Sequence, residues 1–249
     1  MHEKLIVKNL KVVYENDGRT LTALKDFSIK VKENQFVCLL GPTGCGKTTA
    51  LNAIAGFIKH IKGEILLNGK KITKPTKDMG VVFQHNVLFP WKTIKDNIAL
   101  GPKLNDTSKR EIEKITNYYL QLIGLKKYAN YYPEELSGGM KQRVELARVL
   151  ANNPEIILMD EPFGALDAQT RAKSQEQLVR IYNKHKKTII FVTHDIDEAL
   201  LLSDNVIIMT KRHGKIIKLI KNNLQRPRSY KLTTDTNYIK LKKKIIKLL

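Results

Sequence analysis

A glycine-rich segment carries the strongest chemical signal in the sequence. It matches the pattern G-x-x-x-x-G-K-[ST], with a continuously apolar run before it and a helical pattern after it, and it reads Gly41, Pro42, Thr43, Gly44, Cys45, Gly46, Lys47, Thr48 and Thr49. Glycines let the backbone curl so that successive amide hydrogens, from about Gly44 to Thr49, point at phosphate oxygens near the positive end of the following helix. The segment therefore predicts a nucleotide phosphate-binding loop, and a chance glycine-rich turn is the alternative.

Three side chains of this loop have separate expected roles. Lys47 would reach the β and γ phosphates, and Thr48 would place its hydroxyl on Mg²⁺. Thr49 would donate a hydrogen bond to the phosphate nearest the ribose.

Two carboxylates follow the apolar run Ile156–Met159, at the end of a strand where such folds meet their ligands. Asp160 would hold Mg²⁺ through its water shell, and Glu161 would orient and deprotonate an attacking water. Pro162 then ends the strand. Ordinary acidic loop residues are the alternative interpretation.

A second glycine pair lies at the predicted start of a helix, in the segment Leu136–Arg143. Free amides and a hydroxyl from Ser137, Gly138 and Gly139 would form a second phosphate site. A plain helix cap with flexible glycines is the alternative. Two phosphate sites on one chain require either that both face one nucleotide in a monomer or that two chains pair across a two-fold axis.

His194 follows the apolar run Thr188–Val192 and so also lies at the end of a predicted strand. There it could form hydrogen bonds with a γ-phosphate and with the region of Glu161. A lone histidine is more often structural. Gln84 likewise ends the apolar run Val81–Phe83.

The distribution of apolar runs predicts an α/β fold. Residues 4–14 and Phe27–Val31 alternate as half-buried antiparallel strands do. The later runs are short and continuously apolar, which suits a mostly parallel sheet with helices on both faces; they are Phe36–Leu40, Val81–Phe83, Ile156–Met159, Thr188–Val192 and Val206–Met209.

Between about residues 87 and 150 strand signals are absent, which predicts an inserted helical subdomain within a single domain spanning residues 1–249. Helices are expected over 108–123 and 138–152, with Ser108 and Ser137 as caps.

Composition limits the possible compartments and partners. The longest apolar stretches are strand-sized, far below the roughly 18 residues needed to span a bilayer, and no signal peptide is evident. Two cysteines, Cys38 and Cys45, are too few for a disulfide framework. These features predict a cytosolic chain.

The net charge of +20 is unevenly distributed. In residues 211–249, thirteen basic residues against one acidic residue give +12, which leaves +8 for the first 210 residues. The basic residues are 35 lysines and only 9 arginines, whereas groove readout in nucleic acids favours arginine. Compositional bias is therefore favoured over nucleic-acid binding.

As a set, and in their order, these motifs resemble those of the ABC ATPase family over nearly the whole chain. The matches are Walker A at Gly41–Thr49, the Q-loop at Gln84, the signature at Leu136–Arg143 with Gln142, Walker B at Ile156–Glu161, the D-loop at Ala165–Asp167 and the switch histidine at His194. The resemblance implies a P-loop NTPase core with an N-terminal antiparallel β subdomain. It also implies a head-to-tail homodimer in which Ser137, Gly138 and Gly139 of one chain close over ATP held by the other.

The resemblance assigns two further residues. Gln84 would contact Mg²⁺ or the lytic water and sense the membrane partner. Tyr14 lies where the family has an aromatic that stacks on adenine, although core or edge packing is an equally common role for such a residue.

The implied function is that of an ATP-hydrolysing subunit on the cytoplasmic face of a membrane. It would act on permease subunits through the surface near Gln84–Asn97, and indirectly with a solute-binding protein. The segments Leu88–Asn97 and Arg226–Arg228 are most similar to importers of nitrate, sulfonate and taurine, while His85 and Phe89 depart from that pattern. The alternatives are a soluble ABC ATPase acting on nucleic acid or ribosomes, for which the +12 tail is the best argument, and the ATPase of an exporter.

The last segment, Asn237–Leu249, has apolar residues at helical spacing, with lysines elsewhere. Such a basic amphipathic helix could lie on a membrane. Docking of a terminal helix onto its own domain is the favoured interpretation.

Overall fold

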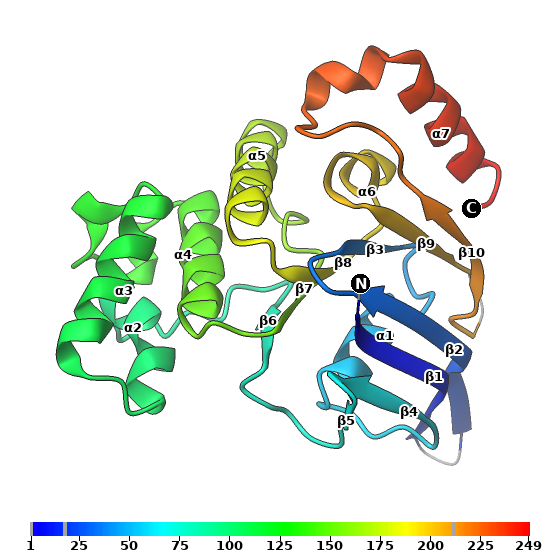
Figure 1. Cartoon of the computed structure of the whole chain (residues 1–249), viewed down its shortest axis with the longest axis horizontal. Helices are drawn as coiled ribbons and strands as arrows, with labels where there is room; N and C mark the ends of the chain where they lie inside the picture. The colour runs from blue at the N-terminus through cyan, green and yellow to red at the C-terminus, as the bar shows by residue number, and fades with distance from the viewer. Residues whose placement is uncertain (1, 17–18, 211–212) are drawn as a thin grey trace. The chain divides into compact units, whose positions relative to one another are not determined.

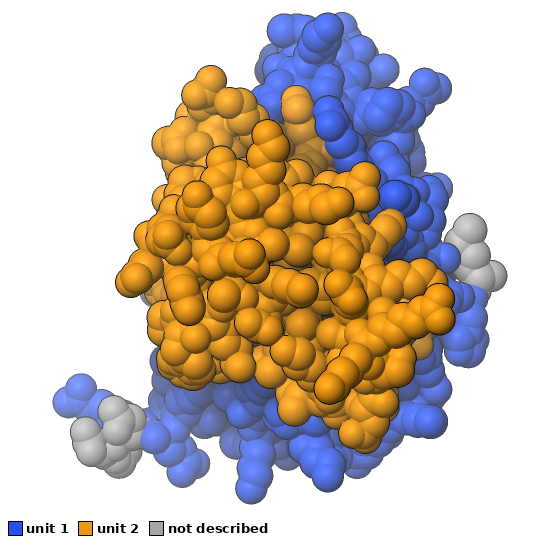
Figure 2. Space-filling view, turned by 90° about the vertical axis from the view of Figure 1, so that its left-hand side faces the viewer, with its two compact units in different colours: residues 1–76, 158–161, 179–249 blue, residues 77–157, 162–178 orange. Residues whose placement is uncertain are grey.

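The computed structural model describes residues 2–16, 19–210 and 213–249. The chain forms two compact units, which Figure 2 shows in different colours. Unit 1 comprises residues 1–76, 158–161 and 179–249, and unit 2 comprises residues 77–157 and 162–178.

Unit 1 begins with an antiparallel sheet in the order β2-β1-β4-β5. Its strands are β1 (Glu3–Asn16), β2 (Arg19–Lys32), β4 (Lys62–Leu67) and β5 (Lys70–Lys71). The alternation predicted for 4–14 and 27–31 is observed, because Leu5, Val7 and Leu10 are buried whereas Lys8 and Asn9 are exposed. The predicted antiparallel sheet at the start of the chain is confirmed.

The second sheet of unit 1 runs in the order β10-β9-β3-β8-β7. Its strands are β3 (Phe36–Leu40), β7 (Ile156–Asp160, whose first two residues belong to unit 2), β8 (Thr188–Thr193), β9 (Asn205–Met209) and β10 (Ile216–Lys221). The central strand β3 pairs in parallel with both β8 and β9, and β10 pairs antiparallel to β9. Every residue of β3, β7 and β8 is buried, as their continuous apolar runs predicted.

Helices cover both faces of this sheet within unit 1 (Figure 1). The helix α1 (Lys47–Ile54) contacts β1, β2 and β8, and α6 (Ile196–Leu202) contacts β3 and β8. A 3₁₀ turn, η3 (Tyr230–Thr234), leads into the last helix, α7 (Thr236–Ile246).

The terminal helix α7 packs on α6 of its own unit. Its residues Tyr238 and Ile245 are fully buried. The Tyr238 hydroxyl donates to Oδ1 of Asp197 at 2.6 Å, and Nζ of Lys242 lies 2.9 Å from Oδ2 of the same carboxylate. The expectation that the tail docks on its own domain is therefore confirmed.

A buried arginine holds the segment between β10 and η3 in place. The guanidinium of Arg228 donates to the carbonyl oxygens of Leu200, Ser203, Asn222 and Leu224 over 2.6–3.3 Å. Burial lowers the pKa of Arg228 to about 10, which still leaves it charged at neutral pH.

Unit 2 is mainly helical. It contains the strand β6 (Met79–Val82), the helices α2 (Ile94–Leu104), α3 (Lys109–Leu122) and α4 (Gly138–Ala151), the 3₁₀ turns η1 (Lys126–Tyr128) and η2 (Pro133–Glu135), and the first part of α5 (Ala168–His185). A core of aliphatic side chains joins the three helices α2, α3 and α4, and includes Ile94, Ile98, Leu120, Ile123 and Val144.

The helices predicted over 108–123 and 138–152 are confirmed as α3 and α4. The hydroxyls of Ser108 and Ser137 cap them by accepting hydrogen bonds from the backbone N–H groups of Glu111 and Met140. The helix α2 was not predicted, because Gly101 and Pro102 interrupt its helical pattern.

Unit 2 extends beyond the predicted insertion of about 87–150 at both ends, and the organisation of the chain as a single domain stays a prediction. None of the helices in the described ranges combines the length and the apolarity that crossing a bilayer requires.

A buried carboxyl group lies inside unit 2. Glu145 of α4 is 2% exposed, and its nearest cationic atom is NH2 of Arg148 at 3.9 Å. The backbone N–H of Phe83 also donates to this carboxyl. Burial outweighs both interactions and raises the pKa of Glu145 to about 7.

Replacing Arg228 with alanine should strongly destabilise the protein. The change removes a donor from four carbonyl oxygens in a buried region, of which those of Leu200 and Ser203 still accept from the Asn222 amide. We therefore expect the free energy of unfolding to fall by about 3 kcal/mol. Urea denaturation followed by circular dichroism measures the loss. Arg180→Ala, which removes an exposed arginine of α5, should change the urea midpoint little. If both variants lose the same free energy of unfolding, the carbonyl contacts of Arg228 do not stabilise the protein.

Glu145→Gln should stabilise the protein at pH 8 but not at pH 5. The folded-state pKa lies above the ordinary carboxyl value, so the neutral form is favoured in the folded protein and stability is lost as the pH rises through about 7. Glutamine cannot ionise, and we expect a gain on the order of 2 kcal/mol at pH 8 from urea denaturation. Glu113→Gln, at an exposed position of α3, is the control. A gain that is the same at both pH values would contradict the assignment.

Candidate nucleotide site

The glycine-rich loop joins β3 to α1 in unit 1. Two of its glycines adopt left-handed backbone angles, φ +77° at Gly44 and φ +101° at Gly46. A Cβ atom at Gly46 would lie 2.8 Å from the carbonyl oxygen of Ala23, so a side chain there is excluded by space as well as by conformation. The loop therefore keeps its curled form only with glycine at this position.

The first turn of α1 leaves its amide groups available to an anion. Gly46 is the N-cap residue and has no side chain with which to accept a hydrogen bond. The N–H groups of Lys47, Thr48 and Thr49 therefore gain no acceptor from the cap. Since no acidic residue stands in the first turn, the positive end of the helix is not neutralised there either.

Lys47 lies inside the loop and is 4% exposed. Its Nζ donates to the carbonyl oxygens of Gly41 at 2.8 Å and Pro42 at 3.1 Å. The same ammonium lies 3.6 Å from Oε1 of Glu161. The backbone of the loop thus holds the cation beside the carboxylate that follows β7.

Glu161 connects the loop to the end of β8. Its Oε2 lies 2.9 Å from Nδ1 of His194, and its backbone N–H donates to the carbonyl oxygen of Val192 at 3.0 Å. Glu161 adopts φ +40°, a left-handed conformation that is unfavourable for a residue with a side chain. The hydrogen bond to Val192 stabilises this conformation, which directs the carboxylate toward Lys47 and His194.

Asp160 faces the hydroxyl of Thr48. The Thr48 Oγ1 donates to Oδ1 of Asp160 at 3.1 Å, and Asp160 is 6% exposed. Burial raises the pKa of the Asp160 carboxyl above its ordinary value, although the Thr48 hydrogen bond acts in the opposite direction. A nearby cation would favour the ionised form of this carboxyl.

Tyr14 reaches the same loop from β1. Its hydroxyl donates to Oγ1 of Thr49 at 3.4 Å, and the residue is 41% exposed. Two other side chains of the loop differ in exposure, because Thr43 is exposed whereas Cys45 is buried. Burial raises the pKa of the Cys45 thiol. The predicted unit 1 residues are therefore gathered around one loop.

The second glycine pair lies in unit 2, at the start of α4. Gly139 is buried, and a Cβ atom there would meet the side chain of Thr170. The Gln142 side chain donates to the carbonyl oxygen of Pro162. Gly138 is more exposed than Gly139, so the start of the helix presents backbone to solvent.

Gln84 follows β6 in unit 2 and is exposed. The roles expected for Gln84, for the second glycine pair and for the unit 1 residues all stay predictions.

One supporting group was missed from the sequence. The Thr193 hydroxyl, directly before His194, donates to Oε2 of the buried Glu198 at 2.6 Å and accepts from the backbone N–H of Asp195 at 3.0 Å. Asp195 caps α6 by accepting from the N–H groups of Asp197 and Glu198. An acidic residue three positions after a capping residue is a recognisable helix-start signal, and it could have located this group.

Comparisons with known proteins support one family. The family model described as ABC transporter matches residues 24–164. The taurine import ATP-binding protein of Rhizobium johnstonii is 47% identical over 223 residues, covering 90% of this chain and 84% of the relative. The aliphatic sulfonates import ATP-binding protein of Bacillus cereus is 42% identical over 233 residues, covering 94% and 90%.

The fold comparison agrees. The dimeric structure of an ATP-binding cassette in a post-hydrolysis state, bound to ADP and Pi, superimposes with a TM-score of 0.77 at 33% identity, covering 89% of this chain and all of that chain. The sheets and helices described above thus form a P-loop NTPase fold. The chain belongs to the ABC transporter family, as an ATP-binding and ATP-hydrolysing subunit.

Proposed function

We propose that the unit 1 site hydrolyses ATP with Glu161 as the general base, and that two copies of the chain act together to drive a permease that imports small anionic solutes such as nitrate, sulfonate or taurine. The observation that carries this proposal is the position of the Glu161 carboxylate, 2.9 Å from the His194 ring and 3.6 Å from the Lys47 ammonium.

Phosphate binding falls to the Walker A loop, Gly41–Thr49. Its amide groups from Gly44 to Thr49 and the Lys47 ammonium supply positive charge and hydrogen-bond donors to the β and γ phosphates. Thr49 contacts the phosphate nearest the ribose, and Tyr14 stacks on the adenine.

Glu161 acts on water. A carboxylate within hydrogen-bond reach of a water can orient it and accept its proton as the oxygen attacks the γ-phosphate. His194 holds the carboxylate through Nδ1 and directs its other ring nitrogen toward the phosphate. Lys47 stabilises the negative charge that develops on the transferred group.

The Thr48–Asp160 pair fits a magnesium ion. Mg²⁺ prefers oxygen ligands and is commonly held by one or two carboxylates, waters and substrate phosphates. In the described ranges no group of three or more His, Cys, Asp and Glu side chains could hold a metal, so a hydroxyl and a carboxylate with water and phosphate are the donors available. The raised pKa of Asp160 supports this, because a buried carboxylate gains from a cation beside it. When bound, Mg²⁺ would neutralise phosphate charge.

A second copy of the chain completes the site. The start of α4 in unit 2, with Ser137, Gly138 and Gly139, offers a hydroxyl and backbone to a second phosphate. Gln142 orients this turn by its hydrogen bond to the Pro162 carbonyl. The similar cassette with ADP and Pi is dimeric, which supports a homodimer with the nucleotide between the signature of one chain and the Walker A loop of the other.

The permease contact is assigned to Gln84–Asn97. Asn97 is fully buried, and its side-chain amide donates to the carbonyl oxygens of Phe89, Lys92 and Thr93. These hydrogen bonds hold the loop backbone, while the loop exposes 70% of Trp91, a residue type common at interfaces. This surface would place the chain as a peripheral subunit on the cytoplasmic face of the membrane.

The relatives' names indicate the transported solute. One is named for taurine import and the other for aliphatic sulfonates import, and identity above 40% over most of the chain supports a sulfonate or a similar anion, with nitrate as the alternative. An importer of this kind also needs a solute-binding protein. We assign the roles of this chain to a single ABC ATPase domain spanning residues 1–249.

Glu161→Gln should abolish turnover while leaving ATP binding intact. Because glutamine cannot accept the proton, we expect kcat to fall by about 100-fold or more. The variant should also accumulate as an ATP-bound dimer, which size-exclusion chromatography with multi-angle light scattering measures alongside phosphate release.

Glu176→Gln, an exposed residue of α5, is the matched control and should behave as the wild type. Normal hydrolysis by Glu161→Gln would exclude Glu161 as the base. A variant that stops hydrolysing but stays monomeric with saturating MgATP would contradict the paired site.

Tyr14→Ala should raise the KM for ATP about fivefold, since an aromatic stacking contact is worth about 1 kcal/mol. Tyr14→Phe keeps the ring but loses the hydrogen bond to Thr49, so its KM should stay near the wild-type value. If both variants raise KM equally, the hydroxyl and not the ring is responsible.

A further inference from the structure

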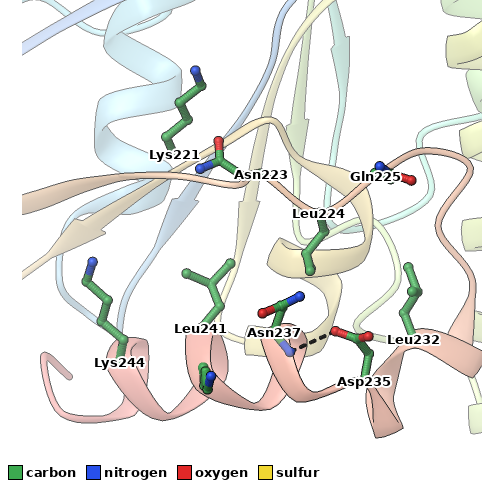
Figure 3. Close-up of a pocket in the computed structure, with 10 residues that line it drawn as sticks. Lys221, Asn223, Leu224, Gln225, Leu232, Asp235, Asn237, Leu241 and Lys244 are labelled. Atoms are coloured by element: carbon green, nitrogen blue, oxygen red, sulfur yellow. Dashed lines mark hydrogen bonds between the residues drawn. The ribbon is translucent and has the colours of Figure 1, made fainter.

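A cavity of about 610 Å³ lies in unit 1, away from the Walker A loop. Its walls are the end of β10, the segment that follows it, η3 and one side of α7 (Figure 3). Its volume falls in the range of about 300–1,000 Å³ that is typical of sites for small molecules.

The middle of the cavity is apolar. Leu224, from the segment after β10, and Leu241, from α7, point toward one another from opposite sides, and Leu232 of η3 lies near one end (Figure 3). All three side chains are partly buried, so they leave apolar surface that no side chain of the protein covers fully. This surface suits a short aliphatic chain.

The rim of the cavity is cationic. Lys221, Lys240 and Lys244 line it, and within the described part of the chain none of these ammonium groups has an ion-pair partner. One acidic residue also lines the cavity, Asp235, but its Oδ1 already accepts from the backbone N–H groups of Asn237 and Tyr238. The cavity therefore keeps a net positive charge with lysines available for an anion.

The walls are held in place by contacts elsewhere in unit 1. The carbonyl oxygen of Leu224 accepts from the Arg228 guanidinium, and its N–H donates to the side chain of Asn222. On the other wall, α7 is fixed by the buried Tyr238 and by the pair of Lys242 with Asp197. Because both walls are anchored, binding a ligand requires no free energy to form the cavity.

We propose that this cavity binds a small organic anion free in solution. An anionic head group, such as a sulfonate or carboxylate, contacts Lys240 and Lys244, and an aliphatic chain lies between Leu224 and Leu241. Asn223 and Gln225 also line the cavity. An anionic lipid also combines an anionic head group with aliphatic chains. A membrane would contact an exposed surface, whereas these leucines face each other inside a cavity.

The helix α7 offers an unusually close control. Lys243 and Lys247 belong to the same basic segment and are exposed, but they do not line the cavity. Lys240→Ala/Lys244→Ala and Lys243→Ala/Lys247→Ala therefore remove the same charge from the same segment. Only the first pair removes the proposed contacts.

The experiment is isothermal titration calorimetry of the full chain with 1-hexanesulfonate, in the presence of ATP and EDTA so that the Walker A loop is occupied. Sodium sulfate tests the head group alone and 1-hexanol tests the chain alone. We expect saturable binding of one hexanesulfonate, with at least tenfold weaker binding of either part. Lys240→Ala/Lys244→Ala should weaken it at least tenfold, and Lys243→Ala/Lys247→Ala less than twofold.

Three results would overturn the proposal. The first is no saturable binding of hexanesulfonate, and the second is an equal loss in both double variants, which indicates a diffuse field of charge. The third is tight binding to phosphatidylglycerol vesicles without binding of hexanesulfonate, which indicates a membrane surface instead. Urea denaturation of both double variants verifies that each is folded.

Discussion

The unit 1 site depends on the two contacts that the Glu161 carboxylate makes. One of its oxygens lies near the Lys47 ammonium at the start of α1, and the other contacts the ring of His194 after β8. Three segments far apart in the sequence meet at this group. Its direction is set by a left-handed backbone at Glu161, which the hydrogen bond to Val192 stabilises, so the end of β8 controls the position of a side chain that follows β7.

The elements that carry local signals were predictable from the sequence. Strands β3, β7 and β8 are buried throughout, and a continuous apolar run is a direct consequence of that burial. The loop before α1 requires glycine at Gly46, where a side chain would meet the Ala23 carbonyl. Ser108 and Ser137 mark two helix starts because their hydroxyls accept from the first turn. In each case the physical requirement restricts the residue type at one position.

The features that sequence did not predict depend on tertiary contacts. The helix α2 forms although Gly101 and Pro102 weaken its local pattern, because Ile94 and Ile98 are fully buried in the core of unit 2. The sequence singles out Arg228 only as part of the basic tail and of the importer-like segment Arg226–Arg228, yet it is buried among four carbonyl oxygens from separate segments. The spacing of residues along the chain does not predict which backbone carbonyl groups will lie near this guanidinium.

The basic residues of the tail have different roles in the folded chain. Arg228 and Lys242 are used inside unit 1, since one binds carbonyl groups and the other pairs with Asp197 of α6. Lys240 and Lys244 line a cavity, while Lys243 stays in solvent. The +12 of this segment is therefore not one electrostatic field, and its sign alone does not indicate nucleic acid or membrane as a partner. Since Asp197 belongs to the helix whose cap, Asp195, directly follows His194, the tail is joined by hydrogen bonds to the element that follows His194.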